Sequence, residues 1–120
     1  MSKIFYSLQI DTISDNFEKI GSLLNIQRNE NKSYWTYEMV HGDTSLDIKE
    51  GTVISHFLNI LEGNYSRLLD LGIRGSDITF WITYEYDDQC NMEFHPEDTK
   101  RLDENGITLC VSCYQYDDQV

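Results

Sequence analysis

The chain has little proline, little cysteine and few basic residues. Its 120 residues include one Pro, three Cys and nine Lys or Arg against 21 Asp or Glu, so the net charge is −12. A single proline and a hydrophobic share of 40% are typical of a globular domain and exclude a proline-rich or low-complexity chain. No apolar stretch approaches the roughly 20 residues of a membrane helix, and no secretion signal stands at the start. We therefore expect one cytoplasmic domain over residues 1–120, with no membrane partner.

The cysteines do not indicate a disulfide framework, because their number is odd and no secretion signal accompanies them. Cys110 and Cys113 form a Cys-x-x-Cys pair, but they lie in a β-patterned run, where residues three apart point to opposite faces. A redox pair of this spacing normally lies at a helix N-terminus, and a tetrahedral zinc site needs four converging ligands. We expect buried or half-buried thiols; a redox or zinc site is the less favoured alternative.

The negative charge is concentrated toward the carboxy-terminal end. Residues 77–120 hold eleven acidic and two basic residues, a net charge of −9, and the first 76 residues carry the remaining −3. A field of this sign disfavours nucleic acid and anionic membranes as partners and favours fast encounter with basic proteins. The simpler interpretation is that the charge only keeps the protein soluble.

Hydrophobic periodicity predicts an α+β fold. Alternating apolar residues predict strands at 4–10, 34–40, 78–86 and 107–116. Helical spacing predicts helices at 17–24, 53–61 and 65–71 and a short helix that begins at Pro96. The first helix is expected to begin with a capping box, in which Asp15 caps and Glu18 reaches back.

Two more strands are expected beside these. A turn at 87–89 predicts a hairpin whose second strand runs through Cys90, Met92 and Phe94, and Leu46 with Ile48 could add a short strand. Amphipathic helices need an apolar sheet face to pack against. We therefore predict an α+β fold: a single domain with a mixed or mainly antiparallel sheet of about five strands and helices packed on one face.

The order of packing residues along the chain carries a family likeness. The matching positions are Leu8, Ile10, 23–26, Trp35, 45–48, 58–72, Phe80, 95–97, Leu102, 106–109 and Tyr114. On these positions nearly the whole chain resembles the bacterial domain-of-unknown-function family 4279. The resemblance implies an α+β domain from a bacterium; it brings no catalytic residue and no agreed activity.

A six-residue sequence occurs twice with one difference, at Tyr84–Gln89 and at Tyr114–Gln119, where Glu85 corresponds to Gln115. In the first copy the tyrosines share the parity of Ile78 and Phe80, whereas in the second copy they oppose the apolar residues of their own strand. The two copies are therefore expected to face different ways, and the second copy to lie on the side of the sheet away from the helices.

That uncovered side is the candidate site. Aromatic residues beside carboxylates on an uncovered sheet are a surface of the kind that is enriched at protein interfaces. The predicted partner-binding residues are Trp81, Glu85, Asp87, Asp88, Tyr114, Tyr116, Asp117 and Asp118. Dimerisation through the same face, or shielding of the rings by the loop 29–33, is the alternative.

No residue set in the sequence indicates catalysis or metal binding. The aspartate pairs lack the glycine-containing spacing of a calcium loop, and neither a Ser-His nor a Cys-His set nor a Gly-rich phosphate loop is present. We expect no enzyme, no metal and no cofactor. The expected function is an acidic binding protein of the immunity or inhibitor kind that engages a basic protein partner; the alternative is a self-associating housekeeping or regulatory module without a toxin partner.

Overall fold

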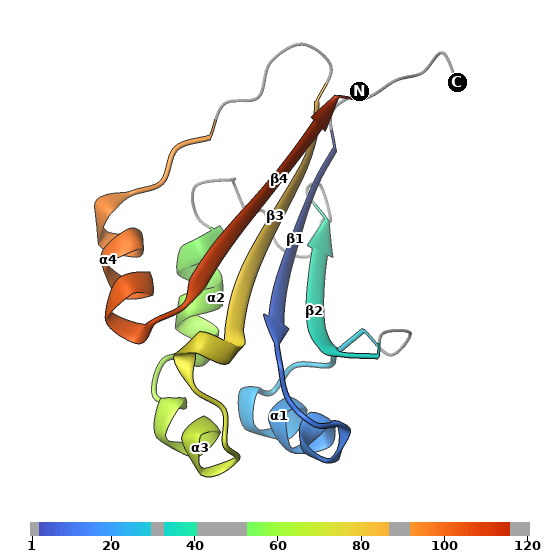
Figure 1. Ribbon diagram of the computed structural model, residues 1–120, viewed down its shortest axis with the longest axis vertical. Helices are drawn as coiled ribbons and strands as arrows, with labels where there is room; N and C mark the ends of the chain where they lie inside the picture. The colour runs from blue at the N-terminus through green and yellow to red at the C-terminus, as the bar shows by residue number, and fades with distance from the viewer. Residues whose placement is uncertain (1–2, 30–32, 41–52, 87–91, 116–120) are drawn as a thin grey trace.

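A four-stranded sheet forms the centre of the fold (Figure 1). The computed structural model describes residues 3–29, 33–40, 53–86 and 92–115. The strands are β1 (Lys3–Ile10), β2 (Trp35–Val40), β3 (Ile78–Tyr86) and β4 (Thr108–Gln115), in the spatial order β2-β1-β3-β4. β1 is antiparallel to both of its neighbours, whereas β3 and β4 are parallel, so the sheet is mixed.

The described residues also form four α-helices. These are α1 (Phe17–Leu24), α2 (Val53–Leu61), α3 (Tyr65–Asp70) and α4 (Pro96–Asn105), with 3-10 turns η1 (Ser14–Asn16) and η3 (Gly75–Asp77) before α1 and β3. In Figure 1, α2 and α4 lie to one side of the sheet, and α1 and α3 lie at its lower end. α4 supplies the crossover that two parallel strands require. No helix in the described part of the chain is both long and apolar enough to cross a membrane.

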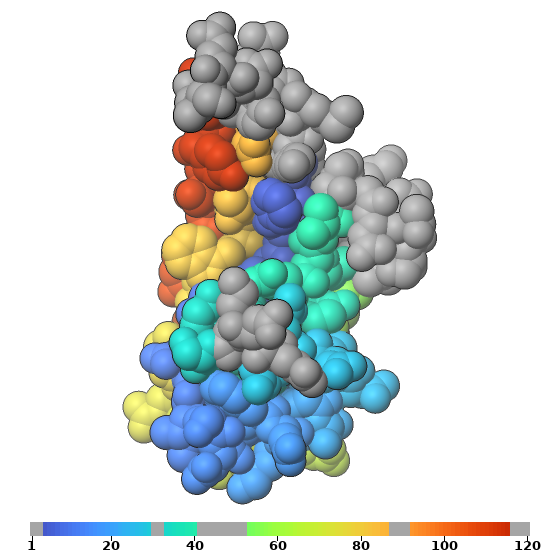
Figure 2. Space-filling model, turned by 90° about the vertical axis from the view of Figure 1, so that its right-hand side faces the viewer, coloured from blue at the N-terminus to red at the C-terminus, as the bar shows by residue number. Residues whose placement is uncertain are grey.

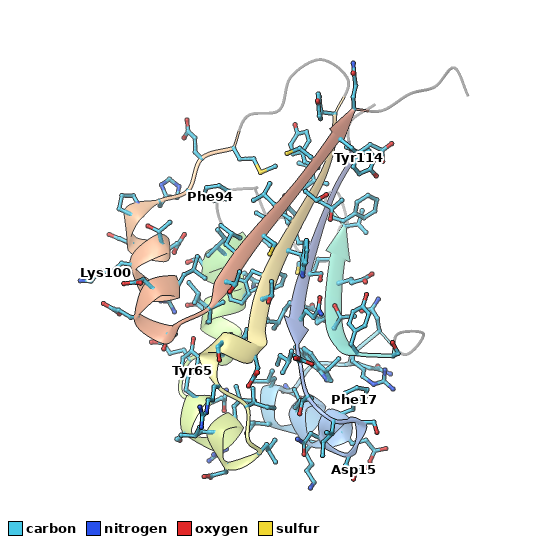
Figure 3. The ribbon with its side chains drawn as sticks, in the orientation of Figure 1. Asp15, Phe17, Tyr65, Phe94, Lys100 and Tyr114 are labelled. Carbon is cyan, nitrogen blue, oxygen red and sulfur yellow. The ribbon has the colours of Figure 1, made fainter. Side chains whose placement is uncertain are left out.

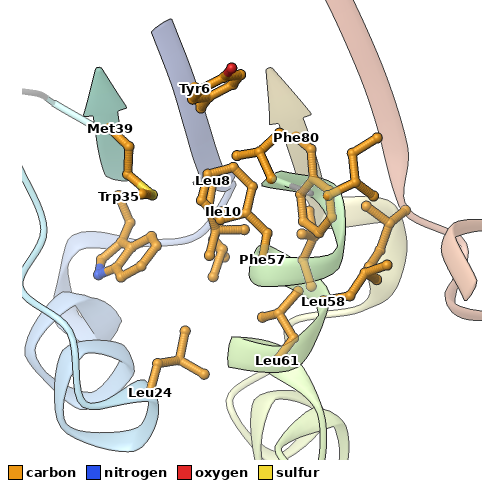
Figure 4. Packing of buried hydrophobic residues seen from close by; sticks show 14 of the residues in the cluster. Tyr6, Leu8, Ile10, Leu24, Trp35, Met39, Phe57, Leu58, Leu61 and Phe80 are labelled. Carbon is orange, nitrogen blue, oxygen red and sulfur yellow. The ribbon is translucent and has the colours of Figure 1, made fainter. Parts of the chain in front are cut away.

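The core lies between the helices and one face of the sheet (Figure 4). Leu8 on β1, Trp35 on β2 and Phe80 on β3 are at most 1% exposed, because the period of two in a strand sends every second side chain to this face. Phe57 of α2 packs edge to face against Phe80, with 5.3 Å between the ring centroids. For β1, β2 and β3 and the helices that cover them, the predicted elements and the sheet face predicted to be buried are confirmed.

The prediction of about five strands needs correction, because the described residues form four. Met92 and Phe94 are not in a strand, so the predicted hairpin is wrong where the structure describes it, and Cys90 lies outside the described residues. Both apolar side chains are half-buried against the core in the segment that leads to α4, so their alternation does not reflect a strand. The predicted short strand at Leu46 and Ile48 also lies outside the described residues.

The predicted capping box at α1 is wrong as well. Asn16, not Asp15, occupies the N-cap position, and its side chain makes no capping hydrogen bond. Asn16 is buried instead: its Nδ2 donates to Thr12 Oγ1 at 2.9 Å and to the carbonyl oxygen of Leu71 at 3.1 Å. A tertiary contact between the start of α1 and the end of α3 has replaced the local cap.

Candidate functional site

One side of the sheet carries none of the described helices, and Figure 2 shows it with β4, β3, β1 and β2 from left to right. We call this side the open face. By strand register and alternation its residues are Phe5, Ser7, Gln9, Thr36, Glu38, Val40, Thr79, Trp81, Thr83, Glu85, Thr108, Cys110, Ser112 and Tyr114. Hydroxyl groups, aromatic rings and carboxylates therefore share one surface.

A groove of about 370 Å³ lies on the open face over β1. Its lining includes Phe5, Ser7, Gln9, Tyr34, Glu38 and Trp81. Ser7 is the register partner of Glu38 on β2 and of Trp81 on β3, so a carboxylate and an indole stand on either side of a small residue. Because adjacent strands lie about 4.8 Å apart, the backbones of these two flanking residues are separated by about 10 Å.

Glu38 is positioned by Asn29, which lies beside β2. The Asn29 side-chain amide donates to Glu38 Oε2 at 3.4 Å, and the backbone N–H of Glu38 donates to Asn29 Oδ1 at 3.0 Å. The backbone N–H of Asn29 donates to the carbonyl oxygen of Thr36 at 2.8 Å. Asn29 therefore fixes the Glu38 side chain at the edge of the groove.

A second carboxylate of the open face, Glu85, is joined to Tyr114 near the upper end of β4, where Figure 3 labels the tyrosine. Tyr114 donates its hydroxyl hydrogen to Glu85 Oε2 at 3.0 Å. This hydrogen bond is the main cause that raises the pKa of Tyr114 above 10.0; desolvation and the negative charge of Glu85 act in the same direction. The phenol is therefore held in its protonated, donating form.

Three of the predicted partner-binding residues lie in the described part of the chain, and the structure places Trp81, Glu85 and Tyr114 together on the open face. Tyr84 lies on the opposite side and is half-buried, so the two copies of the repeat do face different ways there. Tyr114 is 46% exposed. The alternative that the loop 29–33 shields the rings depends on residues 30–32, which lie outside the described residues. The other predicted residues, Asp87, Asp88, Tyr116, Asp117 and Asp118, lie outside the described residues.

The groove was missed by sequence reasoning, although a signal was present. Phe5 and Val40 are apolar residues at the strand positions that point away from the core, and Val40 is 48% exposed. An apolar side chain at such a position marks a surface with a use beyond solubility. Tyr34 precedes β2 and lines the groove at 39% exposure; it shares the parity of Val40 in the predicted strand 34–40, so it carried the same signal.

The predictions for β4 need one correction. The apolar residues of the last strand, which include Val111 and Cys113, were expected to share the covered face, and the thiols to be at least half-buried. Val111 is 42% exposed and Cys113 is exposed, because β4 is an edge strand of the described sheet. Cys110 is half-buried, as expected. Its register partner is Trp81, whereas Cys113 pairs with Tyr84, so the two thiols lie on opposite faces.

No three His, Cys, Asp or Glu side chains of the described residues converge as metal ligands would. The predicted lack of a metal and of a cofactor stays a prediction. No family model matches the chain, and neither does any curated protein or solved structure. The resemblance to family 4279 likewise stays a prediction, and the function is argued from the open face.

Proposed function

We propose that this protein is a non-enzymatic, acidic binding protein of the immunity or inhibitor kind, which acts in the bacterial cytoplasm and binds a basic protein through its open face. The observation that supports this most is the placing of rings beside carboxylates: Trp81 faces Glu38 across the groove, and Tyr114 is bonded to Glu85. Rigid aromatic side chains beside hydroxyl groups are typical of surfaces that bind proteins.

The groove suits one cationic side chain of the partner. An arginine that enters over Ser7 would lay its planar guanidinium along the Trp81 ring and bring its N–H groups to the Glu38 carboxylate. Asn29 already fixes that carboxylate, so little side-chain freedom is lost on binding. Interfaces commonly draw most of their affinity from a few such anchored side chains.

The charge of the chain would speed the encounter. β3 and β4 are parallel, and their last residues, Tyr86 and Gln115, are register partners, so the two strands end side by side. The sequence attaches an aspartate pair just beyond each of them, at 87–88 and 117–118. Steering by such a field raises association rates and weakens as salt is added.

The test uses the product of the adjacent gene, because an immunity protein is expected beside its toxin. Its affinity for the protein is measured by calorimetry, and its association rate by stopped flow at several salt concentrations. Glu38→Gln should weaken binding about tenfold, the effect of one charged hydrogen bond at an interface. Glu97→Gln is the matched control, since Glu97 is exposed on α4 and lies away from the open face; it should change affinity less than twofold.

Two results would contradict the proposal. One is an adjacent product that fails to bind; the other is binding that Glu38→Gln and Trp81→Ser leave unchanged. Lysozyme, a basic protein chosen without regard to shape, controls for charge alone. If lysozyme is attracted by net charge alone, Glu38→Gln and Glu97→Gln should reduce its binding equally.

Self-association is the second candidate, and the apolar side chains of Phe5 and Val40 on the open face favour it. The charge opposes it, because two copies that stack would each carry −12. A concentration-dependent dimer in sedimentation that Trp81→Ser disperses would replace the first candidate by the second.

A further inference from the structure

We infer that the outer edge of β4 receives an extended segment of the partner as an added strand. That the segment is basic rests on the proposed function, whereas the lack of a second neighbour for β4 among the described strands is a separate observation. Among the described strands β4 has a neighbour on one side only, β3. The outward backbone N–H and C=O groups of such a strand are a template for another chain.

β4 lacks the features that normally block pairing at the edge of a sheet. Its eight residues, TLCVSCYQ, include no charged residue and no proline. Natural edge strands are usually protected from pairing with another chain by a lysine, a proline or a bulge, or because they are very short. Val111 and Ser112 are exposed although they point to opposite faces, so the strand is accessible from both sides there. None of the described residues from Thr108 to Ser112 therefore opposes strand addition.

The opposite edge of the sheet is occupied at Thr36 and Glu38, which provides a contrast with β4. Asn29 takes the place of a neighbouring strand beside β2: its backbone N–H donates to Thr36, and its side-chain oxygen accepts from the N–H of Glu38. One residue thus supplies both the donor and the acceptor that a paired strand would supply. Within the described residues, this part of the β2 edge is occupied, whereas β4 has a neighbouring strand on one side only.

The occupant that fits best is a segment with alternating apolar and basic residues. Its apolar side chains would lie beside Leu109 and Val111 on the helix side of the sheet. Leu109 is half-buried and Val111 is exposed. Its basic side chains would point to the open face beside Tyr114 and the carboxylate bonded to it. A second copy of this chain is disfavoured, since it would bring another −12 to the same edge.

The probe is a nine-residue peptide of alternating lysine and valine, acetylated and amidated at its ends. Its control has the same sequence with alternate backbone nitrogens methylated, which keeps every charge but removes the donors needed for pairing. Affinity is measured by calorimetry, and hydrogen exchange of the full chain locates the contact. We expect the unmethylated peptide to bind at least tenfold more tightly and to protect amides within 108–112.

Matched variants test the edge without relying on charge. Val111→Lys and Val111→Glu both place a charge on β4, and Leu69→Lys and Leu69→Glu make the same changes at an exposed apolar position of α3. Both β4 variants should reduce peptide affinity at least fivefold, whichever the sign of the charge. In both α3 variants, peptide affinity should change only as the net charge of the protein changes. Both positions are exposed, so all four variants should fold, which a circular dichroism melt checks.

Three outcomes would overturn the inference. If the two peptides bind equally and hydrogen exchange changes only around Trp81 and Thr83, the open face binds cations and the edge does not; the proposed function then survives. If neither peptide binds, the edge is not a strand-addition site. If sedimentation shows a dimer that Val111→Lys dissociates, the occupant is a second copy rather than a basic segment. Peptide pairing that persists in Trp81→Ser would support the edge inference, because it would show that pairing does not depend on the groove.

Discussion

The two tryptophans of the chain allow the open face to be tested with one kind of substitution. Trp35 lies in the core with no measurable exposure, whereas Trp81 is half-buried on the other side of the sheet. Trp35→Ser removes a fully enclosed side chain, which costs about 3–5 kcal/mol of unfolding free energy. That is a large share of the roughly 5–15 kcal/mol available to a domain, so this variant should be largely unfolded at moderate temperature.

The matched variant Trp81→Ser should cost far less. The cross-strand neighbours of Trp81 are the small residues Ser7 and Cys110, and each such pair contributes about 0.2–1 kcal/mol. The total loss is about 1–2 kcal/mol, which lowers the melting temperature by about 3–5 °C for each kcal/mol in a domain of this size. Binding of the partner, in contrast, should be lost in this variant.

Urea denaturation followed by circular dichroism measures both free energies, and fluorescence adds an internal check. The Trp81→Ser protein retains only Trp35, so its emission should be at shorter wavelength and resist quenching by acrylamide. The Trp35 signal of the folded protein is thereby assigned without a further variant. If Trp81→Ser destabilises the chain as strongly as Trp35→Ser, Trp81 is a core residue and the open face is covered. The binding site proposed on it would then be wrong.

Three further predictions concern single contacts. Replacing Glu85 by Gln should lower the pKa of Tyr114 toward 10.0, because the charged acceptor is lost; an unchanged tyrosine titration by ultraviolet absorbance would refute the hydrogen bond. Burial lowers the pKa of His56 below 6.5, so the stability from its neutral form is present above pH 6.5 and is lost as pH falls through the lowered pKa; His56→Gln should flatten the acid side of a melting-temperature profile. Gly75→Ala should cost about 1–3 kcal/mol in urea denaturation, because its Cβ would overlap the backbone of Asn105; a neutral result would contradict the close packing of η3 on the end of α4.

Much of the fold could be predicted from local pattern. β3 was predicted with its observed bounds because apolar residues alternate from Ile78 to Tyr86, and α4 was expected to begin at Pro96, whose missing N–H suits the first turn of a helix. Parity also placed Tyr114 with Trp81 and Glu85, since a period of two leaves only two faces to choose between.

The neighbour of each strand could not be predicted from the sequence, because alternation indicates which face a side chain points to but not which strand lies beside it. Met92 and Phe94 alternate like a strand but only pack against the core, and β3 pairs instead with β4, which follows after the intervening helix. The groove depends on register in the same way. Nothing local indicates that Glu38 and Trp81 would flank Ser7 from different strands.

Asn29 also decides how far association can proceed. A sheet with two open edges can add strands at both and grow into a fibre. Here the contacts of Asn29 with Thr36 and Glu38 occupy that part of the β2 edge, so among the described strands the inferred addition would take place at β4. Addition of a strand at a single edge would give a complex of fixed size, whereas addition at both edges would give a polymer.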